Sequence, residues 1–332
     1  MDKKVIKNYI INIAAIFAVY AVLKGLIYAG VITRYHQGII VFILINVILA
    51  TSLNLAVGFL GQLTLGHAGF MAVGAYVSAI TAVALNANFN LPKIVVLLIS
   101  LTLAAIVSAL TGVAIGIPAL RLRGDYLAII TLGFGEVIRV IINNIKVTGG
   151  AQGFTGIPKL STLDNVFWIT VLAVAFLYTL THSRQGRAIL SIREDEIAAE
   201  AVGVKTTSFK VMGFAIAAGL AGIGGGLYAH YIAFLDPNTF NFMRSVEILI
   251  IVVLGGMGSL TGSIVAAIVL TIMPEALRSF NELRLLLYAL ILVVMMIFKP
   301  SGLFGTEEFS WQGIYDRYKT RKNALHNREK KV

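Results

Sequence analysis

Two pairs of oppositely charged side chains have a spacing that could support chemistry in an otherwise apolar sequence. Glu136 and Arg139 lie three positions apart, and Arg244 and Glu247 repeat that spacing. Residues three apart share one face of a helix, so each pair can form an ion pair. Two interpretations stay open for both pairs: a structural pairing that lets a charged segment enter lipid, or the polar lining or gate of a pathway.

The sequence offers little for catalysis or metal binding. His67 and His230 have no second histidine or carboxylate at metal-ligand spacing, so each is interpreted as a packed, hydrogen-bonded side chain. Cysteine is absent, and so are the G-x-x-x-x-G-K-[ST], G-x-G-x-x-G, H-E-x-x-H and G-x-S-x-G motifs. We therefore expect a chain that is not an enzyme, with no catalytic residue, metal or cofactor of its own. Any energy for transport then comes from a partner or an ion gradient.

The composition is that of a membrane protein with many spans. Of 332 residues, 58% are hydrophobic and 13% charged, and the mean hydropathy is +0.87. Soluble domains carry about 25% charged residues, so soluble enzymes, nucleic-acid-binding proteins and secreted disulfide scaffolds are excluded. A span needs roughly 20 apolar residues. Candidates lie at 9–32, 37–57, 67–85, 94–116, 126–144, 165–181, 209–233, 244–257, 261–278 and 283–298.

The positions of the basic residues predict an orientation. With the N-terminus cytoplasmic and all segments crossing, most of the 27 basic residues fall on the cytoplasmic side, as the positive-inside rule requires. Eight crossings with re-entrant segments would place both termini on the same side as ten crossings do. We expect a transmembrane domain at 1–310, with a cytoplasmic loop at about 182–210, and a basic cytoplasmic tail at 311–332.

Two segments share the pattern G-x-x-G-[QS]-L-T, and each follows an apolar run: GFLGQLT (58–64) and GGMGSLT (255–261). We call them the first and second glycine segments. Glycine-interrupted spans in corresponding halves point to a transport pathway, because the backbone of a broken helix must avoid lipid. The short segment 244–257 is expected to be a half-helix joined to 261–278. The predicted pathway residues are Gly58, Gly61, Gln62, Thr64, His67, Glu136, Arg139, Glu247, Gly255 and Gly258.

The loop at 182–210 is the richest polar segment between spans. A short helix is expected to start at Asp195, a good N-cap, and to end at Gly203. It carries an apolar stripe of Ile197, Ala198, Ala201 and Val202. The acidic residues beside the stripe, Glu194, Glu196 and Glu200, disfavour an anionic lipid surface. A soluble partner protein is therefore the expected occupant of the stripe.

Several long motifs resemble the permease family of ABC importers for branched-chain amino acids, and most closely its LivM-type subunits. They are GFLGQLTLGHAGFMAVGAY (58–76), RLRGDYLAIITLGFGEVIR (121–139), GRAILSIREDEIAAEAVGV (186–204), DPNTFNFMRSVEILIIVVLGGMGSLTGS (236–263) and KPSGLFG (299–305). The resemblance covers most of residues 37–305. It implies an all-α polytopic protein of the prokaryotic cytoplasmic membrane. Its fold would be type II-like, with an internal repeat and about ten transmembrane helices, some of them broken or half-helices.

The resemblance also implies partners. These are a LivH-type permease subunit, two cytoplasmic ABC ATPases that bind ATP and magnesium, and an extracytoplasmic substrate-binding protein. Residues 186–204 would dock in a cleft of the ATPase, with coupling residues Gly186, Arg187, Arg193, Glu194, Asp195, Glu196, Glu200 and Gly203.

Branched-chain or other hydrophobic amino acids are the implied substrates, and relatives that carry urea or short amides share the motifs. A stand-alone secondary transporter or channel remains an alternative, but it leaves the amphipathic cytoplasmic helix without a purpose. An intramembrane enzyme would need a catalytic constellation that the spans lack.

Overall fold

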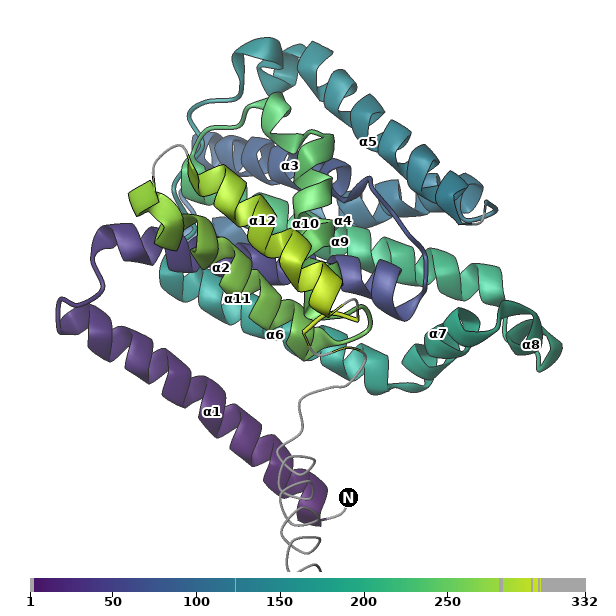
Figure 1. Ribbon diagram of the computed structural model, residues 1–332. Coiled ribbons are helices and arrows are strands. Elements are labelled where there is room, and N and C mark those ends of the chain that lie inside the picture. The colour runs from purple at the N-terminus through teal and green to yellow at the C-terminus, as the bar shows by residue number, and fades with distance from the viewer. Residues whose placement is uncertain (1–2, 123, 281–282, 300, 304, 306–332) are drawn as a thin grey trace, which may run out of the picture.

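The computed structural model describes residues 3–122, 124–280, 283–299, 301–303 and 305 (Figure 1). The predicted tail at 311–332 lies outside the described residues. Within them the chain folds into twelve α-helices: α1 (Lys3–Tyr28), α2 (Arg34–Asn54), α3 (His67–Asn88), α4 (Lys93–Ala119), α5 (Asp125–Asn144), α6 (Leu163–His182), α7 (Arg184–Glu194), α8 (Glu196–Ala201), α9 (Thr206–Ile232), α10 (Phe242–Gly255), α11 (Leu260–Ala276) and α12 (Leu283–Phe298). Every predicted apolar segment coincides with a helix.

Length and composition allow five of the described helices to cross a membrane: α2 with its π-helical extension, α3, α4, α6 and α9. Shorter apolar helices lie at Ala14–Tyr28, Leu260–Ala276 and Ala289–Phe298. Helix α5, which carries Glu136 and Arg139, and the 14-residue α10 are not among these helices.

Helix α9 packs against α2, α3 and α4, and α3 and α4 also pack against each other. Its glycines remove side chains where these neighbours pass. A Cβ at Gly222 would overlap the Ser108 side chain of α4, and one at Gly225 would overlap the Met71 carbonyl of α3. Small residues let helix backbones approach closely in lipid, where van der Waals packing drives association. The glycine run at 222–226 therefore makes α9 the core helix.

Helices α7 and α8 form a hairpin between α6 and α9 at one end of the bundle (Figure 1). We call this the α7–α8 end. At the opposite end, the loop after α5 pairs with the loop after α9 through backbone hydrogen bonds between Phe154 and Leu235. Helix α1 leans away from the bundle in Figure 1 and is tied to the start of α6 by an ion pair of 2.7 Å between Lys24 and Asp164.

Two interruptions divide the helices at the α7–α8 end. Helix α2 passes into a π-helical turn at Leu55–Phe59, and α10 and α11 are separated by the residues from Gly256 to Ser259. Gly256 and Gly258 have φ of +112° and +93°, a backbone conformation that glycine adopts without strain. Ser259 then caps α11 by accepting from the Gly262 N–H at 3.1 Å. The predicted break between the segments 244–257 and 261–278 is confirmed.

Candidate functional site

The two glycine segments, far apart in the sequence, lie against each other. Asn54, the last residue of α2, accepts a hydrogen bond from the Gly258 N–H at 2.8 Å. Its amide nitrogen donates to the Ser259 carbonyl at 2.8 Å and to the Ser263 hydroxyl at 2.9 Å. All four residues are buried. The Asn54 amide thus satisfies backbone groups that the break between α10 and α11 leaves open.

This contact requires a glycine on the α2 side. A Cβ at Gly58 would overlap both the Asn54 amide oxygen and the Gly258 backbone nitrogen. Gly58 lies within the π-helical turn, a feature that often marks functional positions because it rearranges the local backbone. The first glycine segment is therefore shaped to receive the second, and we call this contact the glycine junction.

Arg193, the predicted coupling residue at the end of α7, reaches the glycine junction. Its Nη1 donates to the Gly58 carbonyl at 2.8 Å. A Cβ at Gly61 would lie 3.3 Å from the Arg193 Cγ, and one at Gly258 would lie 2.6 Å from its Nη1. The structure therefore joins predicted coupling and pathway residues in one cluster.

The α7–α8 hairpin is held firmly to the bundle. Ser183 caps α7 by accepting from the Gly186 N–H at 3.2 Å, and a Cβ at Gly186 would overlap the last carbonyls of α6. Ile189 and Ile192 of α7 are buried, the first beside Gly213 of α9. The hairpin is thus a packed element with a defined position.

Helix α8 begins and ends as predicted. Asp195 accepts from the N–H groups of Ile197 and Ala198 at 2.9 and 3.0 Å. Gly203 follows the helix with φ of +88°. Glu196 forms an ion pair of 2.7 Å with Lys210, whose side chain is 4% exposed. This pair fastens α8 to the first turns of α9.

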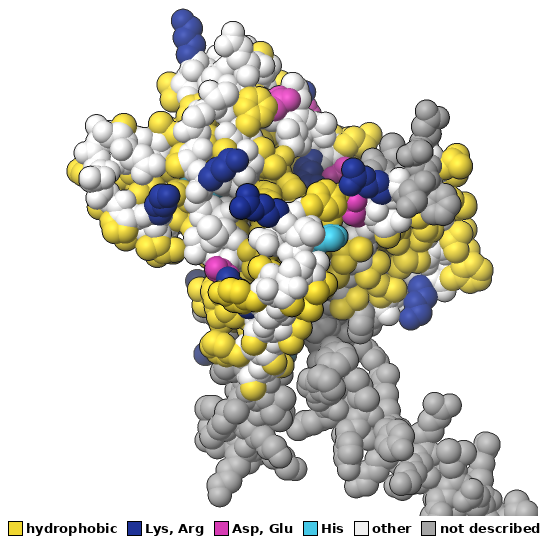
Figure 2. Space-filling model, turned by 90° about the vertical axis from the view of Figure 1, so that its left-hand side faces the viewer, with side chains coloured by type: hydrophobic (Ala, Val, Ile, Leu, Met, Phe, Trp, Pro, Cys, Tyr) yellow, Lys and Arg dark blue, Asp and Glu magenta, His cyan; other side chains and the backbone are white. Residues whose placement is uncertain are grey.

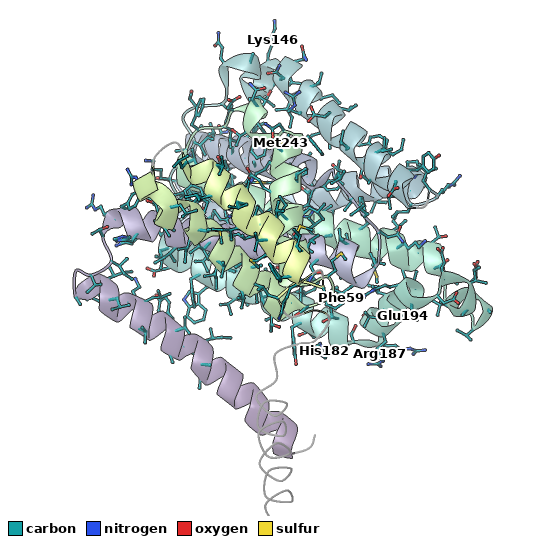
Figure 3. The ribbon with its side chains drawn as sticks, in the orientation of Figure 1. Phe59, Lys146, His182, Arg187, Glu194 and Met243 are labelled. Atoms are coloured by element: carbon teal, nitrogen blue, oxygen red, sulfur yellow. The ribbon has the colours of Figure 1, made fainter. Side chains whose placement is uncertain are left out.

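The predicted apolar stripe of α8 faces outward. Ile197 and Val202 are 74% and 80% exposed, and Ala198 and Ala201 are exposed between them. Glu194 and Glu200, which flank the stripe in the sequence, are exposed as well, and so is Arg187 on α7. Figure 3 shows Arg187 and Glu194 together at this end, near Phe59 of the π-helical turn.

Glu136 and Arg139 lie away from the glycine junction. Their side chains pair at 2.7 Å, and Glu136 also accepts from the Phe242 N–H at 3.1 Å. Arg139 donates to the Asn238 side chain at 3.1 Å. A carboxylate is favourable beside the first N–H groups of a helix, so this pair fixes α5 to the start of α10. These contacts place the pair at the end opposite α7 and α8, where it joins α5 to the start of α10.

The remaining residues of the first glycine segment connect the junction to α3. The backbone N–H of Gln62 donates to the Ala56 carbonyl at 2.9 Å, which turns the chain back. Thr64 is buried, and its hydroxyl has no hydrogen-bond partner in the described part of the chain. His67 is buried at the start of α3, with its Nε2 3.0 Å from the Ser52 hydroxyl. His67 is therefore a packed histidine, as expected.

Glu247 belongs to a cavity of about 820 Å³. The cavity is lined by the first turns of α2 and α10 and the last turns of α9 and α11, so it lies at the end opposite α7 and α8. Met243, labelled in Figure 3 far from Arg187 and Glu194, is one of its lining residues. The predicted pathway residues thus separate into the glycine junction, with Gly255 beside it, the Glu136–Arg139 pair and this cavity.

Sequence reasoning missed three polar residues that these sites depend on: Asn54, Lys210 and Asn46. Each interrupts or borders an apolar segment. Polar residues within spans are rarely idle, so the signal was present in the sequence. Their partners were not, since those contacts join residues distant in the chain.

The comparisons with known proteins identify the family. The family described as "Branched-chain amino acid transport system / permease component" matches residues 35–298. The chain belongs to this family. Among the curated permease relatives, LivM of Salmonella typhimurium is 38% identical over 82% of this chain and 70% of its own length. LivM of Escherichia coli is 36% identical over 87% of this chain and 74% of its own length.

The second permease type of the family is also similar. LivH of Escherichia coli is 29% identical over 51% of this chain and 55% of its own length. The names of these relatives describe both types as high-affinity branched-chain amino acid transport system permeases. No solved structure matches the chain.

Proposed function

We propose that this chain is a permease subunit of an ATP-driven importer for branched-chain and other hydrophobic amino acids. It pairs with a LivH-type permease and works with two ABC ATPases and an extracytoplasmic substrate-binding protein. The observation that carries the proposal is the α7–α8 hairpin. It presents an exposed apolar stripe outward, and its Arg193 contacts the glycine junction inward.

The chain would transmit motion and perform no bond chemistry. The ATPases bind ATP and magnesium, and their closure displaces α8. The Glu196–Lys210 pair and the buried face of α7 pass this displacement to α9, and Arg193 passes it to the glycine junction. Such coupling is largely rigid-body movement between packed elements.

The orientation follows from the same assignment. The α7–α8 end faces the cytoplasm, together with both chain termini, and the cavity faces the other side of a prokaryotic cytoplasmic membrane. We infer about ten crossings, with α10 as a half-helix and a type II-like arrangement. Support comes from the basic residues Arg121, Arg184 and Arg187, which lie at or near the α7–α8 end.

Replacing the apolar stripe tests the proposal. We expect the variant Ile197→Asp/Val202→Asp to lose capture of the partner ATPase and ATP-dependent leucine uptake, because burying two carboxylates against a partner is unfavourable. Val147→Asp is the matched control, since Val147 is 65% exposed at the opposite end. The measurement is pull-down of the ATPase, followed by uptake in proteoliposomes. A native chain that captures no ATPase would favour a stand-alone transporter.

A further inference from the structure

The cavity at the end opposite α7 and α8 combines charges of both signs with an aromatic wall. Arg34 and Arg244 line it together with Glu247 and Glu275. Pockets of roughly 300–1,000 Å³ hold small molecules, and the volume of about 820 Å³ falls within that range. Figure 2 faces this end and shows basic and acidic side chains among hydrophobic ones. Balanced charges of this kind suit a ligand that carries both signs itself.

The guanidinium of Arg244 is held in a fixed position at the wall. Its Nη2 donates to the Asn46 amide oxygen at 2.8 Å, and its Nη1 donates to Glu247 at 2.8 Å. Asn46 is itself oriented by donating to the Thr271 hydroxyl at 3.0 Å. An arginine has five N–H donors, and these bonds use two of them. The group is therefore preorganised to bind a carboxylate with the others.

Glu247 supplies the opposite charge one helical turn away on α10. Its side chain is 59% exposed, while that of Arg244 is 21% exposed. The carboxylate can accept from an ammonium group on its open side while it keeps the bond to Arg244. The pair thus presents a positive and a negative site within the span of an α-amino acid headgroup.

The apolar side of the cavity is built from aromatic rings. Phe42 of α2 packs against Tyr231 of α9 with ring centroids 5.4 Å apart and against Tyr228 at 6.2 Å. Gly38 makes room for this arrangement, because a Cβ there would lie 2.9 Å from the Tyr231 hydroxyl. These rings offer a surface to an aliphatic side chain beside the charged pair.

We propose that this cavity is a binding site for a zwitterionic α-amino acid with an apolar side chain. Arg244 holds the carboxylate, Glu247 holds the ammonium, and Phe42, Tyr228 and Tyr231 contact the side chain. This assignment rests on the proposed function and names the place where the substrate sits in the permease. Urea or a short amide carries neither a carboxylate nor an ammonium group, so it would form neither of these two charged contacts.

Ligand analogues test the assignment group by group. Binding to the assembled importer is measured by saturation-transfer NMR with leucine, with 4-methylpentanoate, which lacks the ammonium, and with 3-methylbutylamine, which lacks the carboxylate. We expect Arg244→Gln to weaken leucine binding about tenfold or more, the effect of losing a charged hydrogen bond. The Arg244→Gln variant should bind leucine no more tightly than it binds 3-methylbutylamine. The Glu247→Gln variant should bind leucine no more tightly than it binds 4-methylpentanoate.

A charge exchange separates recognition from stability. In Arg244→Glu/Glu247→Arg the ion pair can re-form, so the thermal midpoint should stay near that of the native protein while leucine binding stays lost. Lys146→Met, an exposed change outside the cavity, is the control and should bind leucine as the native protein does. Native leucine binding by the exchanged variant, or by both single variants, would overturn the assignment.

Transport distinguishes this result from failure of the proposed function. If the native importer takes up leucine and the cavity variants keep its native KM, the cavity assignment is wrong and the proposed function stands. If the native importer neither binds nor transports leucine, while a short amide is taken up, the substrate of the proposed function is wrong and the cavity assignment fails with it.

Discussion

Arg193 connects the outward-facing surface of the α7–α8 hairpin with the glycine junction inside the bundle. Its backbone belongs to the α7–α8 hairpin, and its guanidinium bonds the Gly58 carbonyl inside the glycine junction at 2.8 Å. A charge-assisted hydrogen bond is strong only within narrow limits of distance and angle. A displacement of α7 by more than about an ångström would therefore weaken it. One side chain thus makes the junction sensitive to the position of the hairpin.

Gly58 is the position where a single methyl group should disturb the junction most directly. We expect Gly58→Ala to reduce ATP-dependent uptake strongly and to destabilise the protein by about 1–3 kcal/mol, the usual cost of overpacking. Gly133→Ala is the matched control, because Gly133 is also helical and has open space around its Cβ position. Uptake in proteoliposomes and the thermal midpoint check both variants. Equal uptake by the two variants would show that the junction does not need close contact.

The buried Lys210 predicts a double-mutant cycle. Glu196→Gln leaves the Lys210 ammonium buried without its ionised partner, so we expect a loss of about 1–3 kcal/mol and weakened coupling. Glu196→Gln/Lys210→Met removes the charge as well and should recover most of the stability. The thermal midpoints of the native, single and double variants give the coupling energy. Additive effects in this cycle would mean that the pair does not hold α8 to α9.

At the residue scale, local patterns were sufficient for some sites and insufficient for others. Asp195 and Gly203 were predicted as the limits of α8 because caps depend on residues a few positions apart. The bond from Gly258 to Asn54 joins residues 204 positions apart, and no periodicity carries that information. The same holds for the bond between Arg244 and Asn46.

At the scale of elements, hydropathy located the helices well and the hairpin incompletely. Long apolar segments predict α2, α4 and α9 within a few residues, because a span of lipid fixes their length. Helix α7 was not predicted, since the charged residues of 184–194 leave only Ile189 and Ile192 as fully buried apolar anchors. The proposed function of α7 depends on this mixture of charged and apolar residues, because one face packs against the bundle while the other stays exposed.

The direction in which α8 projects depends on Gly203. With φ of +88° and open space around it, this glycine allows the turn back into α9. We expect Gly203→Ala to cost about 1–2 kcal/mol and to lower uptake per ATP hydrolysed, because the turn tilts α8 when it relaxes. Gly156→Ala is the matched control, with φ of +76°, equally open space and a position in the loop at the opposite end. Its stability cost should be similar and its coupling native. A Gly203→Ala importer with native coupling would show that coupling does not depend on the direction of α8.

At the scale of the whole molecule, the sequence predicted an all-helical membrane protein but not which helices form its core. Glycine runs occur in several helices, and only their contacts show that α9 is the helix that packs against α2, α3 and α4. The two polar sites then fall at opposite ends, the cavity at one and the glycine junction at the other. This separation is what an alternating-access carrier requires, since each end must open while the other stays closed.

The absence of native cysteine makes the orientation of the whole molecule directly testable. Lys146 is exposed at the end with the cavity, and Arg121 is exposed after α4, near the α7–α8 end. We expect a membrane-impermeant maleimide to label Lys146→Cys from outside intact spheroplasts and Arg121→Cys only in inverted vesicles. The unaltered chain supplies the unlabelled background in both preparations. Labelling of both positions from one side would contradict an odd number of crossings between them, and labelling in the reversed sense would place the α7–α8 hairpin outside, where no ATPase could reach its apolar stripe.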